Sequence, residues 1–321
     1  MPSKILVTGA AGFIGYHVSK ALAESHTVIG IDNYSDYYNP DLKRDRVSIL
    51  TNESNFSFIK MDIVDRQKLS ALFKMERFDI IVHLAAQAGV RHSIENPRPY
   101  IDTNIVGTFN ILEGCRYNSN LKHLVYASSS SVYGRSAKTP FSEEDLVREP
   151  SSLYAASKRS VELMVESYNH LYKLPCTGLR FFTVYGPWGR PDMAYYKFTE
   201  LLYNNQPIPL YNRGKHERAM TYISDIVDGV KTVAESQPES HKIYNLGHYK
   251  TVDLLTLVNT LGSLTKKEIN LEYLPFQSGD VLKTSANINL AGKDFGYSPK
   301  VDFRKGLENF VDWYKWYHKI T

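Results

Sequence analysis

Short apolar runs alternate with amphipathic stretches through the first half of the chain. The apolar runs have the length and composition of buried strands and lie at residues 5–7, 27–31, 56–60, 80–84, 124–126 and 175–180. Helical periodicity separates them, at residues 13–22, 66–73, 100–116 and 152–172. Strands and helices that alternate in this way predict an α/β fold, a doubly wound and mostly parallel sheet.

The pattern changes near residues 181–191, a stretch rich in aromatic residues, Gly and Pro. We therefore predict a cofactor-binding domain at 1–183 and a smaller, mixed α/β substrate lobe at 184–321. Whether some strands and helices of the second part return to the first domain is left open. Residues 33–55 are expected to be an irregular, Tyr-rich insertion, either a surface excursion or a cover for the cofactor or an oligomer contact.

Composition narrows the functional class. The chain has 321 residues, of which 43% are hydrophobic, and its net charge is only +4 with acidic and basic residues interleaved, so we expect neither disorder nor nucleic-acid binding. A strand-like run starts within a few residues of Met1 and no apolar run reaches the length of a membrane span, so the expected location is cytoplasmic. Cys115 and Cys176 are expected to be packed, reduced thiols, and no metal site is expected.

A glycine-rich segment, TGAAGFIG at residues 8–15, follows the first strand and opens a helix. Glycines at this point let the backbone approach a pyrophosphate, which the free N–H groups of the helix then bind. The next strand ends on Asp32, whose carboxylate can accept hydrogen bonds from an adenosine ribose and would repel a 2′-phosphate. This pattern is typical of a Rossmann-type fold that binds NAD, with contacts from Gly9, Gly12, Phe13, Ile14, Gly15, Asp32 and Asn33.

Two further segments stand where later strands reach the same edge of the sheet. Asp62 and Ile63 follow the third strand, and Leu84, Ala85, Ala86 and Gln87 follow the fourth. We interpret them as walls of the adenine and nicotinamide sites.

The candidate chemistry lies between Tyr126 and Lys158. The strand at 124–126 runs into four serines, Ser128 to Ser131, and about 25 residues later Tyr154 and Lys158 stand four apart in a helical pattern. A tyrosine beside a fixed cation can act as a base, and we expect Lys158 to lower the pKa of Tyr154.

Five sequence blocks together resemble the extended short-chain dehydrogenase/reductases, and among them the nucleotide-sugar epimerases of the UDP-glucuronate 4-epimerase type. They are TGAAGFIG at 8–15, HLAAQAGVR at 83–91, SSSSVYG at 128–134, YAASK at 154–158 and LRFFTVYGPWGRPDM at 179–193. The first and fourth are typical of the whole superfamily, and the second and fifth of uronate-type epimerases.

The resemblance implies a UDP-uronic acid substrate, NAD, and a homodimer formed through the helices at 100–116 and 152–172. By position it implies that Ser129, Tyr154 and Lys158 are catalytic and that Asn104, Ser128 and Phe182 lie near the nicotinamide. It also implies that Arg218 binds the diphosphate, Tyr211 belongs to the uracil loop and Thr183 contacts substrate. The chain departs from some relatives at residues 277–283, where they carry an arginine for the second phosphate.

Other functions fit fewer of these residues. A redox-sensing binding protein would not need Ser129, Tyr154 and Lys158 together. A 4,6-dehydratase carries an acid pair where this chain has Ser130 and Ser131, and a UDP-glucuronate decarboxylase has Glu where Ser131 lies. Two alternatives stay open: a 4-epimerase for UDP-glucose or its N-acetylated analogue, and a UDP-glucuronate decarboxylase. We therefore favour C4 epimerisation of a UDP-uronate, with Ser130, Ser131, Thr183 and Arg190 around the sugar and its carboxylate.

Overall fold

The computed structural model describes residues 2–134, 138–238, 240–275 and 282–320. Within these residues seven parallel strands form one sheet in the order β11-β6-β5-β4-β1-β2-β3. They are β1 (Lys4–Thr8), β2 (Thr27–Asp32), β3 (Phe56–Lys60), β4 (Ile80–His83), β5 (His123–Ser129), β6 (Cys176–Phe181) and β11 (Lys242–Leu246). The predicted doubly wound α/β sheet is confirmed. Its strand order reverses between β1 and β4, where such sheets bind ligands at the carboxyl ends of the strands.

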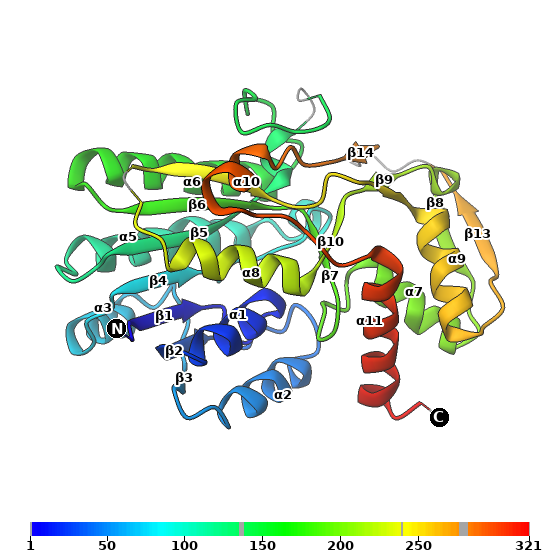
Figure 1. The fold of residues 1–321 in the computed structure, drawn as a ribbon, viewed down its shortest axis with the longest axis horizontal. Helices are drawn as coiled ribbons and strands as arrows, with labels where there is room; N and C mark the ends of the chain where they lie inside the picture. Colours follow the sequence, from blue (N-terminus) through cyan, green and yellow to red (C-terminus); the bar gives the residue numbers. More distant parts are fainter. Residues whose placement is uncertain (1, 135–137, 239, 276–281, 321) are drawn as a thin grey trace.

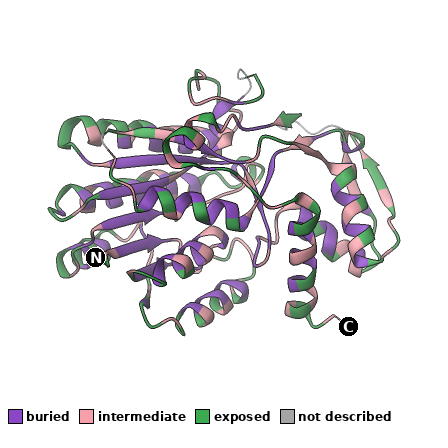
Figure 2. Ribbon diagram, viewed as in Figure 1, coloured by how far each residue is buried: buried purple, intermediate pink, exposed green. Residues whose placement is uncertain are grey.

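Helices cover both faces of the sheet (Figure 1). One layer holds α1 (Phe13–Ala23), α2 (Asp41–Leu50) and α8 (Ile223–Ala234), and the other holds α3 (Arg66–Met75), the π-helix η1 (Tyr100–Gly107), α5 (Thr108–Arg116) and α6 (Leu153–Tyr172). Strand side chains alternate between the layers: Ile5 and Val7 join the core beneath α1, whereas Leu6 joins the core beneath α5 and α6. Figure 2 shows the sheet as the most completely buried layer.

The second lobe lies beyond the carboxyl edge of the sheet, at the right of Figure 1. Its elements are α7 (Ala194–Tyr203), β8 (Ile208–Tyr211), η3 (Asn212–Gly214), β9 (Glu217–Arg218), β12 (Val252–Asp253), α9 (Leu254–Thr265), β13 (Leu271–Leu274), β14 (Lys283–Thr284) and α11 (Phe303–His318). Parallel pairing joins β8 to β13, and β9 pairs with both β12 and β14. From the same half of the chain, α8, β11 and α10 (Asn289–Phe295) pack with the first domain.

One prediction about this architecture is wrong. Residues 33–55 are not wholly irregular, because α2 occupies 41–50. Leu42, Val47 and Leu50 bury one face of this helix, and Arg46 on the same face is fully buried. Two charged residues, Lys43 and Arg46, stand at buried positions of the helix, so the apolar periodicity that would have predicted it is interrupted.

Smaller features refine the prediction. The helix expected at 100–116 begins as η1 and continues as α5, and the stretch at 181–191 contains the short strand β7 (Thr183–Tyr185), paired with β10 (Met220–Tyr222). Two short helices remain, α4 (His92–Glu95) and the 3-10 helix η2 (Ser130–Tyr133). Cys115 and Cys176 are both buried and free, as predicted. In the described part of the chain no helix has the length and apolar character needed to cross a membrane.

Candidate active site

A cleft opens at the carboxyl edge of the sheet, on the side that faces the second lobe. Most of the residues predicted to bind cofactor or substrate line it together. These are Gly9, Gly12, Phe13, Ile14, Gly15, Asp32, Asn33, Asp62, Ile63, Leu84, Ala85, Ala86, Gln87, Ser128, Ser129, Tyr154, Lys158, Phe182 and Arg190. Their loops are far apart in sequence and meet here because parallel strands end at one edge.

The glycine loop forms a tight cradle between β1 and α1. Gly9 has φ +73°, and a Cβ there would lie 2.7 Å from the backbone nitrogen of Ala85. A Cβ on Gly15 would lie 2.0 Å from the carbonyl oxygen of Gly9. Gly12 caps α1 without any side-chain hydrogen bond, so the first N–H groups of the helix are available to an anion. The loop therefore fits a pyrophosphate held by backbone.

Asp32 closes the far end of this cradle. One carboxylate oxygen accepts from the N–H of Ala11 at 3.2 Å and the other from the N–H of Tyr34 at 2.8 Å. Burial raises the pKa of Asp32, and the charge of Lys43 opposes that shift. Two anchored oxygens at the end of a cleft can accept the hydroxyls of a ribose.

The predicted catalytic groups come from β5 and α6. Ser129 ends β5 and caps η2 by accepting from the N–H of Ser131. Ser152 caps α6 by accepting from the N–H of Ala155 at 3.1 Å, which places Tyr154 in the first turn of the helix. Lys158, one turn further on, donates to the carbonyl oxygen of Ala127 at 2.9 Å.

The predicted effect of Lys158 on Tyr154 is wrong for this structure. Burial raises the pKa of Tyr154, while a hydrogen bond with Ser129 and the charge of Arg190 act against that shift. Burial also lowers the pKa of Lys158 to about 8, and the charge of Glu162 opposes this. The sequence pattern could not show that desolvation dominates the pKa of both Tyr154 and Lys158.

A model of the NAD dependent epimerase/dehydratase family matches residues 5–247, most of the chain. The chain belongs to this family. A probable UDP-glucuronate 4-epimerase from Rhizobium meliloti is 41% identical over 97% of this chain and 96% of its own length. UDP-glucuronate 4-epimerase 1 from Arabidopsis thaliana is 44% identical over 98% of this chain and 77% of its own.

The fold likewise resembles a member of known structure. The crystal structure of UDP-glucuronic acid 4-epimerase from Bacillus cereus, in complex with UDP-glucuronic acid and NAD, superposes with a TM-score of 0.92. It is 34% identical and covers 98% of this chain and 99% of that one. The chain therefore has the whole architecture of such an epimerase, not only its cofactor half.

Arg190 reaches the cleft from the loop after β7 and belongs to a small polar network. Its guanidinium forms two bonds with Asp192, at 3.0 and 2.5 Å, and the hydroxyl of Tyr37 donates to Asp192 at 3.1 Å. Arginine has five N–H donors, so Asp192 can orient the guanidinium of Arg190 and still leave donors for a substrate. Burial and the neighbouring Asp192 raise the pKa of Tyr37 to about 12.

Six predicted residues do not line the cleft. They are Asn104, Ser130, Ser131, Thr183, Tyr211 and Arg218. Asn104 is buried and bonds both backbone groups of Gln87, so it positions the cleft wall from behind. The hydroxyl of Ser131 lies 3.1 Å from that of Ser129. Tyr211 packs under the guanidinium of Arg91, 5.0 Å from the ring centroid. The expected diphosphate contacts at 277–283 fall mostly outside the described residues.

Sequence analysis missed several groups that line the cleft. Four of them come from the 33–55 segment, namely Ser35, Tyr37, Tyr38 and Lys43. Lys43 donates to the carbonyl oxygen of Ser35 at 2.8 Å and lies 4.7 Å from the centre of the Tyr38 ring. The high number of tyrosines in this segment was the sequence feature that could have indicated these cleft residues. The structure places it against the cofactor cleft and not on a remote surface.

Proposed function

We propose that the chain is an NAD-dependent epimerase that inverts C4 of UDP-glucuronate to give UDP-galacturonate. The observation that carries the proposal is the single cleft in which Ser129, Tyr154 and Lys158 lie beside the glycine cradle and Arg190. Relatives named as UDP-glucuronate 4-epimerases support the choice of sugar. Incubation of the purified protein with UDP-glucuronate, followed by separation of the products, tests it.

The residues present fit NAD along the length of the cleft. The backbone of the glycine loop and the start of α1 would hold the pyrophosphate, and Asp32 the adenosine ribose. Asp62 and Ile63 would line the adenine end, and residues 84–87, Ser128 and Phe182 the nicotinamide end. When bound, NAD accepts a hydride from the sugar C4 and returns it.

The protein residues would move the proton. Tyr154 takes it from the C4 hydroxyl and holds it on the phenol oxygen, while Ser129 hydrogen-bonds the same sugar oxygen. After the 4-keto sugar has turned to present its other face, Tyr154 gives the proton back. The nucleotide must stay bound while the sugar turns, a task we assign to Tyr211, Arg218 and the second lobe.

The substrate carboxylate would lie near Ser130, Ser131, Thr183 and Arg190. Oxidation at C4 makes a β-keto acid, which loses CO₂ when the bond to the carboxylate aligns with the carbonyl π system. Short hydroxyl donors and an oriented guanidinium can hold the carboxylate out of that alignment without adding negative charge. Ser131 already bonds Ser129 in the structure, so carboxylate binding and the catalytic serine would be linked.

A homodimer completes the proposal. Both η1–α5 and α6 expose large apolar side chains. They include Ile101, Val106, Phe109, Leu163 and Leu171, each at least 39% exposed. Burying such side chains between two copies is favourable. The molecular mass in solution tests this part of the proposal, and a monomer would contradict it.

NAD should bind at least about tenfold more tightly than NADP, a difference of roughly 1.4 kcal/mol. The reason is that the Asp32 carboxylate accepts ribose hydroxyls and repels a 2′-phosphate. Calorimetry on protein freed of nucleotide measures both dissociation constants. Asp32→Asn keeps the shape of the side chain and removes its charge, so it should bring the dissociation constants for NAD and NADP closer together. Equal affinities in the native protein would contradict the assignment of Asp32.

A further inference from the structure

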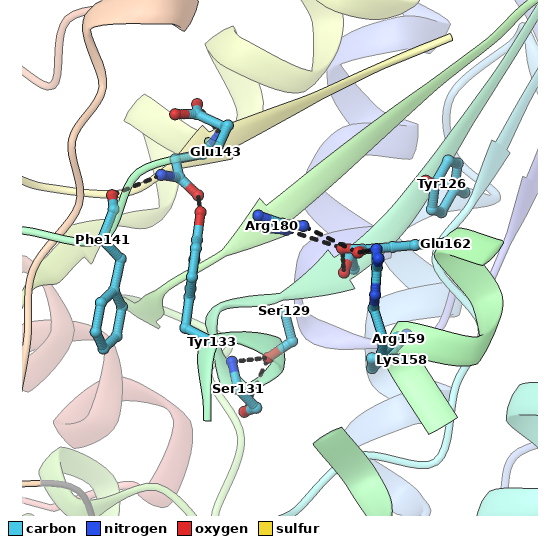
Figure 3. A network of polar contacts seen from close by, with 12 residues as sticks. Tyr126, Ser129, Ser131, Tyr133, Phe141, Glu143, Lys158, Arg159, Glu162 and Arg180 are labelled. Carbon is cyan, nitrogen blue, oxygen red and sulfur yellow. Dashed lines mark hydrogen bonds and ion pairs between the residues drawn. The ribbon is translucent and has the colours of Figure 1, made fainter. Parts of the chain in front are cut away.

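A second polar network, centred on Glu162 of α6, lies close to Ser129 and Lys158 (Figure 3). Glu162 stands one helical turn after Lys158, and both are almost fully buried, with exposures of 1% and 4%. One carboxylate oxygen accepts from the Ser128 hydroxyl at 2.6 Å and from Nε of Arg180 at 2.9 Å. The other accepts from Nη2 of Arg180 at 3.0 Å and from Arg159 at 2.8 Å.

These contacts keep Glu162 ionised although it is buried. Burial favours the neutral acid, but the hydrogen bonds and charge of Arg180 outweigh it, and the pKa of Glu162 is lowered. Arg180 also lies 4.8 Å from the centre of the Tyr133 ring. Both oxygens of the buried Glu162 carboxylate are therefore satisfied, each by two donors, whereas Nη1 of Arg180 has no hydrogen-bond partner among the described residues.

The network joins three elements at the catalytic edge. Ser128 precedes Ser129 on β5, Arg180 is its partner in register on β6, and Glu162 belongs to the helix that carries Tyr154 and Lys158. One carboxylate therefore fixes the strand end that bears the catalytic serine against the helix that bears the other two groups. No step of the epimerisation itself uses Glu162.

Glu162 is also the anion nearest in sequence to the Lys158 ammonium on the same helix face. Burial lowers the pKa of Lys158 to about 8, and Glu162 is the charge that acts in the opposite direction. Among the residues that the structure describes, Glu162 is the only charged group that shifts the pKa of Lys158. Burial lowers the pKa of His83 on β4 to about 3, so it stays neutral, the pKa of Tyr154 is raised, and Arg180 and Arg159 are cations.

We propose that Glu162 is a positioning residue: its carboxylate holds Ser128 and Arg180 against α6 and keeps Lys158 positively charged in the cleft. The proposal rests on the proposed function, in which the Lys158 ammonium would bind the ribose hydroxyls at the nicotinamide end of NAD. The charge state of Lys158 can be measured without any substrate. The proposal for Glu162 and the proposed epimerase function can therefore fail separately.

The titration of Lys158 tests this directly. In protein labelled with ¹³C-lysine, the Lys158 ε-methylene resonance is identified by its loss in Lys158→Arg. It should titrate near pH 8, apart from exposed lysines, which titrate near pH ~10.4. A lysine is charged below its pKa, so losing the favourable anion in Glu162→Gln should move the midpoint down by about one pH unit. Glu166→Gln, the same change one turn further along α6 at an exposed side chain paired with His241, should leave it unmoved.

Glu162→Gln leaves the Arg180 charge buried and unpaired, so the variant could fail to fold. Glu162→Gln combined with Arg180→Met removes both buried charges and should therefore keep the fold. The Lys158 midpoint of this double variant should also lie below the native midpoint. The ratio of Glu162→Gln to native turnover should fall as pH rises from about 6 to about 9. An unmoved midpoint in the folded double variant, or a ratio independent of pH, would overturn the proposal.

Discussion

Tyr154→Phe should lower the turnover of UDP-glucuronate by roughly 10²–10⁴-fold, the loss expected when an acid–base group is removed. Phenylalanine keeps the aromatic ring of residue 154 and its contact with Tyr100, in which the ring centroids are 6.0 Å apart. The affinity for NAD should therefore stay close to native. Only the oxygen that exchanges a proton with the C4 hydroxyl is lost. The measurement is kcat with UDP-glucuronate, beside the dissociation constant for NAD.

Tyr168→Phe is the matched control. Tyr168 stands on the same helix and donates to Glu113 at 2.6 Å, on the face of α6 that packs against α5. Loss of this one part-buried hydrogen bond, which lies away from the cleft, should leave turnover within a few-fold of native. Near-native turnover in Tyr154→Phe would remove this residue from the mechanism.

UDP-glucuronate should be preferred over UDP-glucose by on the order of 10²-fold or more in kcat/KM. Arg190 and the serine hydroxyls would bind a carboxylate, and a hydroxymethyl group would leave these partly buried donors without that partner. In the same assay, Ser130→Ala with Ser131→Ala should release UDP-pentose, because the β-keto acid is then free to align for loss of CO₂. Chromatography of the reaction mixtures measures both effects.

The native protein, run in parallel, should release no UDP-pentose. Equal turnover of the two UDP-sugars, with no pentose from the double variant, would show that the carboxylate is bound elsewhere or that the substrate is a neutral sugar. Pentose from the native protein would favour a decarboxylase.

The fold was predictable because its signals are local. The apolar runs of β1 and β2 and the glycines between β1 and α1 each depend on neighbouring residues, so the strands, the cradle and Asp32 could be placed from sequence. The α2 helix could not, because Arg46 is buried by contacts with distant carbonyl groups, those of Ala11 at 2.8 Å and Trp188 at 2.6 Å.

The polar networks of the site depend on contacts that no sequence pattern contains. Tyr37 meets Asp192 from 155 positions away, and Ser128 meets Glu162 only because β5 and α6 pack together. The pKa of Tyr154 depends on burial, which the YxxxK spacing does not report. Residue types and their order predicted which groups belong to the cleft, and the structure was needed to show what each one contacts.

The most direct test of the account uses UDP-glucuronate carrying deuterium at C4, incubated with the purified protein and followed by NMR and mass spectrometry. The account predicts a mixture of UDP-glucuronate and UDP-galacturonate in which both sugars retain the deuterium at C4, since the same hydride leaves and returns within one closed cleft. Loss of the label to solvent, a UDP-pentose product, or recovery of unchanged substrate would contradict epimerisation through transient oxidation at C4.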